Sequence, residues 1–269
     1  MSNGLQIIVC GSLVPDPLQT LEPVTTPQGP GLKNETMLPS VLDPWAAHAL
    51  FEAANLAKKV PGSQVWLVSL GPKAKLQQLM MTVAQKVPFQ LVAVDGSASG
   101  FTDSQIVAQA LADAISSIPG LDKSRMLVFG GCSSASRDAG VTMQLVGEKL
   151  GICDQFMGVD VLEVKDDGSF TVQERIEGGQ YLVSTCQGAP AVLSWATGNL
   201  PEPPNNPQVG MANMRGVMPS LMKAKKVDVG TGSISYAATE IPAQKRDTRI
   251  VKDASADEIA REIVEWVRR

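Results

Sequence analysis

Short apolar runs alternate with amphipathic stretches through the first 150 residues, and this alternation constrains the fold more than any other feature. The apolar runs are typical of buried strands, and the stretches between them carry apolar residues at helical spacing. Alternation of this kind predicts a doubly wound α/β fold, in which helices cover both faces of a mainly parallel sheet. The predicted strands are 5–10, 64–70, 89–94 and 126–130, and the predicted helices are 45–60, 73–86, 102–118 and a segment that ends at Leu150.

The pattern changes after Gly151, where strand-like runs follow one another without intervening helices. Because consecutive strands with short connections pair antiparallel, these runs predict antiparallel additions to the sheet. The runs are 159–164, 170–176, 180–186 and 191–196, and a turn at 166–168 joins the first two.

Two stretches rich in Pro and polar residues are predicted to lack regular structure. Residues 14–39 are expected to form a long loop or an irregular hairpin, and residues 198–219 a long loop. Residues 224–250 predict an extended arm, because they show little apolar periodicity. Ser255 and Glu258 form the ends of a capping box, which predicts a final amphipathic helix that reaches Arg269.

The composition excludes several classes of protein. The chain has 269 residues and a formal net charge of −4, so it lacks the excess of Lys and Arg that binding to nucleic acid requires. No apolar run reaches the roughly 18 residues that a membrane span needs. The first residues carry no basic segment before an apolar run, so we expect neither a transmembrane helix nor a secretory signal.

Cysteine and histidine usage narrows the chemistry further. The four cysteines form no CxxC pair, which favours the reducing cytoplasm as the protein's location. His48 is the only histidine, which excludes a His-rich metal site and leaves a single candidate base for a Ser-His-Asp triad. Since His48 lies in an Ala-rich helical pattern, we interpret it as an ordinary helix residue. We therefore expect no metal site and no catalytic acid–base residue.

One loop has the chemistry of an anion site. Residues 130–142, GGCSSASRDAGVT, leave a predicted strand and enter a predicted helix. Small residues let backbone N–H groups approach an anion, and the positive end of a helix favours a phosphate. The alternative, a flexible Ser- and Gly-rich connection, stays open at this point. No GxxxxGK[ST] motif occurs, and Gly230-Thr231-Gly232 does not lie between a strand and a helix.

Further segments occur in a recognisable order along the chain. The opening strand leads into a V-x-D-P turn, Leu-Asp-Pro-Trp precedes the first long helix, and a D-x-x-x-T-x-Q pattern runs through the small-residue loop. The matching segments are 7–17, 42–45, 68–72, 138–144, 176–179, 190–192 and 221–226. In sequence and order they resemble the beta subunit of electron transfer flavoproteins over nearly the full length of the chain.

The resemblance implies an electron carrier of the adenine nucleotide alpha hydrolase-like fold. Such a beta subunit pairs with an alpha subunit that holds most of the FAD, and it buries a structural AMP. The pair carries electrons from a dehydrogenase, such as an acyl-CoA dehydrogenase, to a quinone-linked or other reductase. Residues 1–225 would be the nucleotide-binding domain, and residues 226–269 an arm and helix that embrace the partner subunit.

The resemblance also implies the residues of the cofactor sites. Trp45 occupies the place of the aromatic residue that approaches the flavin. The implied AMP pocket consists of Cys10, Asp43, Ser69, Leu70, Gly131, Asp138, Gly140, Val141 and Thr142. The phosphate would lie at the helix that opens near Thr142, held by N–H groups and the hydroxyl.

The chain departs from the family pattern at two points in this pocket. A lysine that usually follows the first strand is Ser12 here, and Arg137 stands within a run that is usually acidic. We hypothesise that Arg137 replaces the lysine by facing an anion; the alternative is a solvated loop arginine. Electron-bifurcating members carry a second FAD in place of AMP, and the bulkier side chains of this loop favour AMP. A stand-alone adenine-nucleotide-binding protein remains the alternative from another class.

A surface for redox partners is implied near the Lys-rich run. In the family, an apolar residue before a proline docks onto dehydrogenases, and Met218-Pro219 lies at that position. Lys223 and Lys226 are expected to steer acidic partner surfaces. The methionines at positions 211, 214, 218 and 222 recur at helical spacing, although Pro219 interrupts the pattern. They form either an adaptable docking surface or a buried set under a loop.

Overall fold

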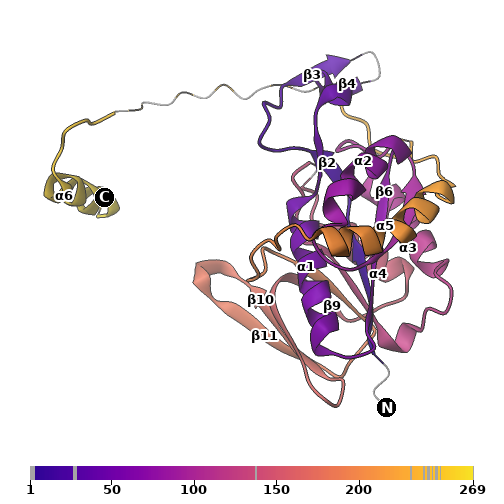
Figure 1. Cartoon of the computed structure of the whole chain (residues 1–269). Helices are drawn as coiled ribbons and strands as arrows, with labels where there is room; N and C mark the ends of the chain where they lie inside the picture. The colour runs from indigo at the N-terminus through magenta and orange to yellow at the C-terminus, as the bar shows by residue number, and fades with distance from the viewer. Residues whose placement is uncertain are drawn as a thin grey trace. The chain divides into compact units, whose positions relative to one another are not determined.

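The computed structural model describes residues 4–26, 29–136, 138–230, 232–238, 240, 243, 245, 248 and 250–268 (Figure 1). The chain forms two compact units, one up to residue 239 and one from residue 240 onward.

A nine-stranded sheet runs through the described residues of the first unit, in the order β11-β10-β9-β12-β8-β1-β6-β7-β13. The neighbouring strands from β9 to β13 in this order all pair parallel. The pairs β9–β10 and β10–β11 at the other end of the sheet are antiparallel. The strands are β1 (Gln6–Cys10), β6 (Gln64–Gly71), β7 (Gln90–Asp95), β8 (Met126–Gly131), β9 (Gln155–Val164), β10 (Phe170–Arg175), β11 (Tyr181–Cys186), β12 (Ala191–Trp195) and β13 (Lys225–Lys226).

Helices cover both faces of this sheet. α1 (Pro44–Lys59), α2 (Lys73–Val83) and α5 (Pro207–Met222) lie on one face, and α3 (Ser104–Ser116) and α4 (Thr142–Lys149) lie on the other. Successive residues of β1, such as Ile7 and Ile8, point into opposite cores and are both fully buried. The central strands are therefore continuously apolar, and the doubly wound α/β prediction is confirmed.

The order of the strands places a topological switch point beside β1. The chain runs outward from β1 through β6 to β7 and then returns through α3 to β8, on the other side of β1. α1 and α3 consequently lie on opposite faces of the sheet. Ligands of doubly wound sheets bind in the crevice that opens at the carboxyl ends of the strands at such a point.

Residues 13–42 contain short paired strands outside the main sheet. β2 (Leu13–Pro15) pairs with β5 (Ser40–Leu42), and β3 (Pro23–Thr26) pairs antiparallel with β4 (Gly29–Leu32). Of the two predictions for this stretch, the irregular hairpin is closer to the structure than a loop. The 3₁₀ turns of the unit are Glu35–Met37, Lys123–Arg125 and Glu177–Gly179.

Two expectations for the second half need correction. β12 was expected among the antiparallel additions, but it pairs parallel with both β8 and β9. The long loop predicted at 198–219 is wrong from residue 207 on, because α5 occupies Pro207–Met222. Asn206 caps this helix and Pro207 follows at its first position. The helix continues past Pro219, whose missing N–H affects only its last turn.

The second unit contains α6 (Ala256–Val267). The Ser255 hydroxyl accepts a hydrogen bond from the N–H of Glu258, and the Glu258 carboxylate accepts one from the N–H of Ser255, so the predicted capping box is confirmed. Ile259, Ile263 and Trp266 are exposed on this helix. Across the residues described in both units, no helix has the length and apolarity that crossing a membrane demands.

Candidate nucleotide site

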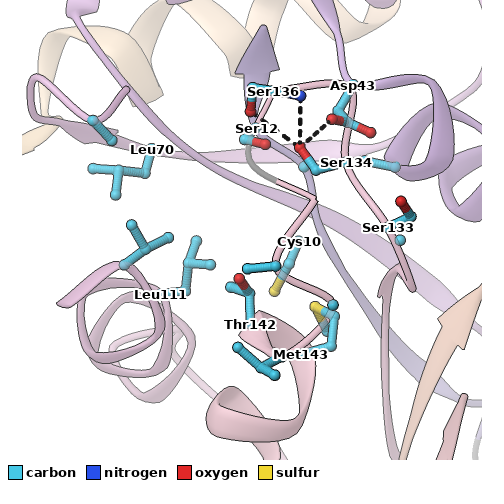
Figure 2. A pocket seen from close by; sticks show the side chains of 18 of the residues that line it. Cys10, Ser12, Asp43, Leu70, Leu111, Ser133, Ser134, Ser136, Thr142 and Met143 are labelled. Atoms are coloured by element: carbon cyan, nitrogen blue, oxygen red, sulfur yellow. Dashed lines mark hydrogen bonds between the residues drawn. The ribbon is translucent and has the colours of Figure 1, made fainter. Parts of the chain in front are cut away.

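A pocket lies at the carboxyl ends of β1 and β8, at the switch point of the sheet (Figure 2). Cys10 ends β1 and Gly131 ends β8, and both line the pocket. α3 supplies Val107 and Leu111, and the start of α4 supplies Thr142. The cavity measures about 90 Å³. The pocket is therefore built by the elements that the fold brings together at its expected ligand crevice.

Asp43 fixes the wall of the pocket. It caps α1, where one carboxylate oxygen accepts a hydrogen bond from the Trp45 N–H at 3.1 Å. The other oxygen accepts hydrogen bonds from the Ser134 hydroxyl at 2.8 Å and from the Ala135 N–H at 2.9 Å. The side chain is buried, and this burial raises the pKa of the carboxyl, although the hydrogen bonds counteract the shift. A single carboxylate thus joins the start of α1 to the loop that follows β8.

The loop after β8 is held by its own serines. Figure 2 shows the Ser134 hydroxyl between Asp43 and Ser136, and its oxygen accepts a hydrogen bond from the Ser136 N–H at 3.2 Å. The Ser133 hydroxyl donates to the carboxylate of Asp138. Asp138 and Gly140 both have positive φ, of 50° and 66°. The tight turn explains why a glycine and an aspartate stand there, since both tolerate this backbone region.

α4 begins at the pocket with Thr142, and its first turn lacks a side-chain cap. Val141 occupies the capping position, where it provides no hydrogen-bond acceptor. The first N–H groups of a helix have no partner inside the helix, and together with the helix dipole they favour an anion. The Thr142 side chain lies at this end of the pocket beside Cys10 and Met143 (Figure 2). This end of the pocket has the geometry of a phosphate site.

Part of the pocket wall is apolar. Leu70 from β6 and Leu111 from α3 face one another across it, near Cys10 (Figure 2). Burial raises the pKa of the Cys10 thiol to about 12, so this cysteine is a neutral, apolar wall. A flat aromatic ring is the kind of group that such a wall accommodates.

The residues expected at the nucleotide site can be placed relative to this pocket. Seven of the predicted residues line it: Cys10, Asp43, Leu70, Gly131, Gly140, Val141 and Thr142. Three others do not. Ser69 is fully buried, and its hydroxyl has no hydrogen-bond partner among the described residues. The Asp138 carboxylate accepts a hydrogen bond within the loop, and Trp45 packs beside Gly131. Arg137 lies outside the described residues, so the hypothesis about it stays a prediction.

Several lining residues were missed by the sequence analysis. Ser133, Ser134 and Ser136 belong to a loop whose composition was noted, but no signal showed which serines face the pocket. Val107 and Leu111 lie on the buried face of α3, and the sequence alone does not show which end of the sheet a crossover helix reaches.

Among the described lining residues, Asp43 is the only charged side chain. The same part of the chain contains no cluster of three or more His, Cys, Asp or Glu that could hold a metal ion.

The expected docking residues lie together at the end of α5. Met218, Pro219 and Lys223 are exposed at its last turns, and Lys226 follows in β13 at the edge of the sheet. Of the four methionines at helical spacing, Met214 is partly buried against the core, whereas Met211, Met218 and Met222 are exposed at 65%, 37% and 76%. The buried interpretation is therefore wrong for three of the four.

Comparison with known proteins identifies the family. No curated protein matches the chain. The family model described as "Electron transfer flavoprotein domain" matches residues 34–234, which is more than half of the chain. This range includes α1, the loop after β8 and α5. The chain therefore belongs to the electron transfer flavoprotein family and has the electron-carrying role of that family.

Proposed function

We propose that this chain is the beta subunit of a heterodimeric electron transfer flavoprotein. An alpha subunit holds most of the FAD, and the chain itself buries AMP in the pocket at the switch point. The pair takes electrons from a dehydrogenase and delivers them to a quinone-linked or other reductase in the cytoplasm. FAD supplies the redox chemistry, and this chain supplies position and polarity.

The uncapped start of α4 carries the proposal. It presents N–H groups and the Thr142 hydroxyl to a pocket that is also lined by the apolar side chains of Leu70 and Leu111. A nucleoside monophosphate combines an aromatic base with a terminal anion, so its two ends match the two ends of this pocket. The residues present therefore fit an adenine nucleotide.

The size of the pocket bears on which nucleotide it holds. Ligand pockets usually measure about 300–1,000 Å³, and this one measures about 90 Å³. A nucleotide must therefore displace the loop that Asp43 holds through Ser134 and Ala135. A second FAD needs a larger displacement than AMP, so the small pocket favours AMP over the bifurcating alternative.

Trp45 is proposed to face the flavin of the partner subunit. It is half-buried at the first turn of α1, and it packs against the end of β8. A Cβ on Gly131 would lie 2.5 Å from the Cβ of Trp45, so only glycine allows this approach. The start of the Trp45 side chain is consequently held close to the carboxyl end of β8, the edge of the sheet at which the pocket lies.

The domain division is also a proposal. We assign residues 1–225 to nucleotide binding and residues 226–269 to an arm and helix that hold the alpha subunit. α6 supports this assignment, since its apolar residues Ile259, Ile263 and Trp266 are exposed. The exposed Leu182 and Val183 of the edge strand β11 are a second apolar surface for the same partner.

Nucleotide release tests the function. The chain is co-expressed with its alpha subunit, the heterodimer is denatured, and the released nucleotides are identified by chromatography. One FAD and one AMP per heterodimer are expected. Two FAD and no AMP would instead indicate the bifurcating alternative.

Variants locate the AMP. Thr142→Val removes the hydroxyl and is expected to lower the AMP content while FAD is retained; Thr197→Val, outside the pocket, is the matched control. Equal AMP content in both variants would contradict the placement at α4.

A chain that is stable, monomeric and free of flavin without any partner would favour the stand-alone nucleotide-binding protein, and solution mass tests this.

A further inference from the structure

A cleft lies between α1 and the end of β9, and we refer to it as the α1–β9 cleft. Its volume of about 400 Å³ is within the roughly 300–1,000 Å³ of ordinary ligand pockets. Residues 52–60 of α1 and its C-terminal cap contribute one wall, residues 162–168 the other, and Trp195 of β12 also lines the cleft. No described residue lines both this cleft and the nucleotide pocket. The α1–β9 cleft is therefore a separate cavity.

Trp195 carries the observation that points to a ligand in this cleft. Its side chain is 1% exposed, and its indole N–H has no hydrogen-bond partner among the described residues. The indole nitrogen can only donate, and native proteins rarely leave a buried donor without an acceptor. The ring belongs to the core that α1 covers and packs against Phe129, with ring centroids 5.4 Å apart. Because the same residue lines the cleft, an acceptor that enters the cleft from solvent can complete this hydrogen bond.

The α1 wall of the cleft presents polar groups of more than one kind. Glu52, Asn55 and Lys59 are three and four residues apart, so they lie along one stripe of the helix. Glu52 is half-buried, and one of its carboxylate oxygens accepts a hydrogen bond from the Asn199 N–H at 3.3 Å. Asn55 is half-buried as well, and its amide can both donate and accept. Together with the indole N–H of Trp195, the less exposed lining residues thus offer a donor, an acceptor and a group that is both.

The charged residues of the cleft favour a neutral ligand. Lysines and carboxylates line it in nearly equal number, namely Lys59 and Lys165 against Glu52, Glu163 and Asp166. Neither sign dominates, so the cleft attracts neither anions nor cations strongly. Hydroxyl groups are neutral, and each of them both donates and accepts. Neighbouring hydroxyls on one small molecule therefore match an N–H, a carboxylate and an amide at the same time.

We propose that the α1–β9 cleft binds a small neutral ligand with several hydroxyl groups, a polyol or a monosaccharide. One of its oxygens accepts a hydrogen bond from the indole N–H of Trp195. Its other hydroxyls donate to the carboxylate of Glu52 and bond to the amide of Asn55. The proposal does not rest on the proposed function, because the nucleotide pocket and this cleft have no described lining residue in common.

The test uses the full chain with its alpha subunit, labelled with ¹⁵N on the tryptophan indoles. The indole N–H signal of Trp195 is identified as the one that Trp195→Phe lacks. Glycerol, myo-inositol, ribose and glucose are titrated as the hydroxylated probes, and acetamide and acetate as probes without a hydroxyl group. At least one hydroxylated probe is expected to move the Trp195 signal until it saturates. The signals of Trp45, Trp66 and Trp266 are expected to stay in place, because these residues do not line the cleft.

A matched pair of variants locates the ligand on α1, with Kd measured by isothermal titration calorimetry so that it does not depend on the signal assignment. Asn55→Leu is expected to raise the Kd for the bound probe about fivefold, which corresponds to the loss of one hydrogen bond. Asn205→Leu is the control and is expected to leave Kd unchanged, because Asn205 is exposed and does not line the cleft. Unchanged far-ultraviolet circular dichroism would show that both variants are folded.

A Trp195 signal that none of the hydroxylated probes moves would overturn the proposal, because water alone would then be the acceptor of the indole N–H. A shift that only acetamide or acetate produces would overturn it as well, since the ligand would then belong to another chemical class. Equal Kd values for Asn55→Leu and Asn205→Leu would contradict the placement of the ligand against α1.

Discussion

Asn213 is predicted to determine the stability of the chain to an unusual degree for a polar residue. Its amide Nδ2 donates to the carbonyls of Ala84 at 2.7 Å and Val87 at 2.8 Å, and its Oδ1 accepts from the Phe89 N–H at 3.3 Å. These three groups belong to the turn that joins α2 to β7, and the side chain is 8% exposed. Asn213 thus replaces the hydrogen bonds that water would otherwise make to this turn.

The substitution Asn213→Leu keeps the branched shape and the number of heavy atoms of the side chain and removes all three hydrogen bonds. A buried polar group that loses its partner costs about 1–3 kcal/mol. Three groups give at least about 3 kcal/mol, and we expect about 4 kcal/mol because the turn can relax partly towards solvent. Typical domains are stable by about 5–15 kcal/mol, so this single change would remove a large fraction of the stability.

Urea unfolding followed by far-ultraviolet circular dichroism measures the effect. With a slope of about 3 kcal/mol per M, the midpoint is expected to fall by about 1 M. Asn205→Leu is the control, because Asn205 is exposed just before α5. A midpoint for Asn213→Leu that falls no further than that of Asn205→Leu would refute the reasoning.

Three further predictions concern the pocket. Burial raises the pKa of the Asp43 carboxyl above its ordinary value of 3.8, so the stability that Asp43 contributes falls as the pH rises from 3.8 to the pKa in the folded protein. Urea unfolding at several pH values is expected to show the difference in unfolding free energy between wild type and Asp43→Asn shrinking over this pH range. Gly131→Ala is expected to lower the free energy of unfolding by about 1–3 kcal/mol, measured by thermal unfolding, and to lower the AMP content, because the added Cβ would lie 2.5 Å from the Cβ of Trp45 in α1. Gly216→Ala is the control and is expected to change neither, because a Cβ there would meet nothing within 4 Å. The Cys10 thiol, with a pKa of about 12, is expected to resist alkylation at pH 8 while the exposed Cys153 reacts, as mass spectrometry of both peptides would show.

The sequence predicted the core of the fold because that part depends on local patterns. Apolar runs and helical spacing are properties of neighbouring residues, so the central strands and α1 to α4 were found close to their observed positions. α5 was missed because its stability depends on distant contacts. Asn206 and Pro207 are typical of a helix start, but Pro219 and the glycines that follow favour a loop in a prediction from sequence. The helix is stabilised by the packing of Val217 and Leu221 against the core, which local sequence does not show.

The lining residues that can be predicted from the sequence are those at the carboxyl ends of the predicted strands. Cys10, Leu70 and Gly131 come at the ends of β1, β6 and β8, and these ends meet at one edge of a parallel sheet. Ser69 illustrates the limit of this reasoning. Adjacent residues of a strand point to opposite faces of the sheet. Leu70 therefore lines the pocket, whereas the Ser69 hydroxyl is buried outside it.

Asp43 connects the start of α1 to the binding behaviour that the proposed function requires. The hydrogen bonds from Ser134 and Ala135 hold the loop at the pocket wall. The cavity of about 90 Å³ is smaller than the roughly 300–1,000 Å³ of usual ligand pockets, so we expect this loop to move when a nucleotide enters. The apparent affinity is then the intrinsic affinity reduced by the fraction of molecules in which the loop is open. Because hydrogen bonds to a charged group are worth about 1.5–3 kcal/mol each, that fraction is small. AMP is therefore expected to bind slowly to the preformed subunit, because the loop must open before the nucleotide can enter.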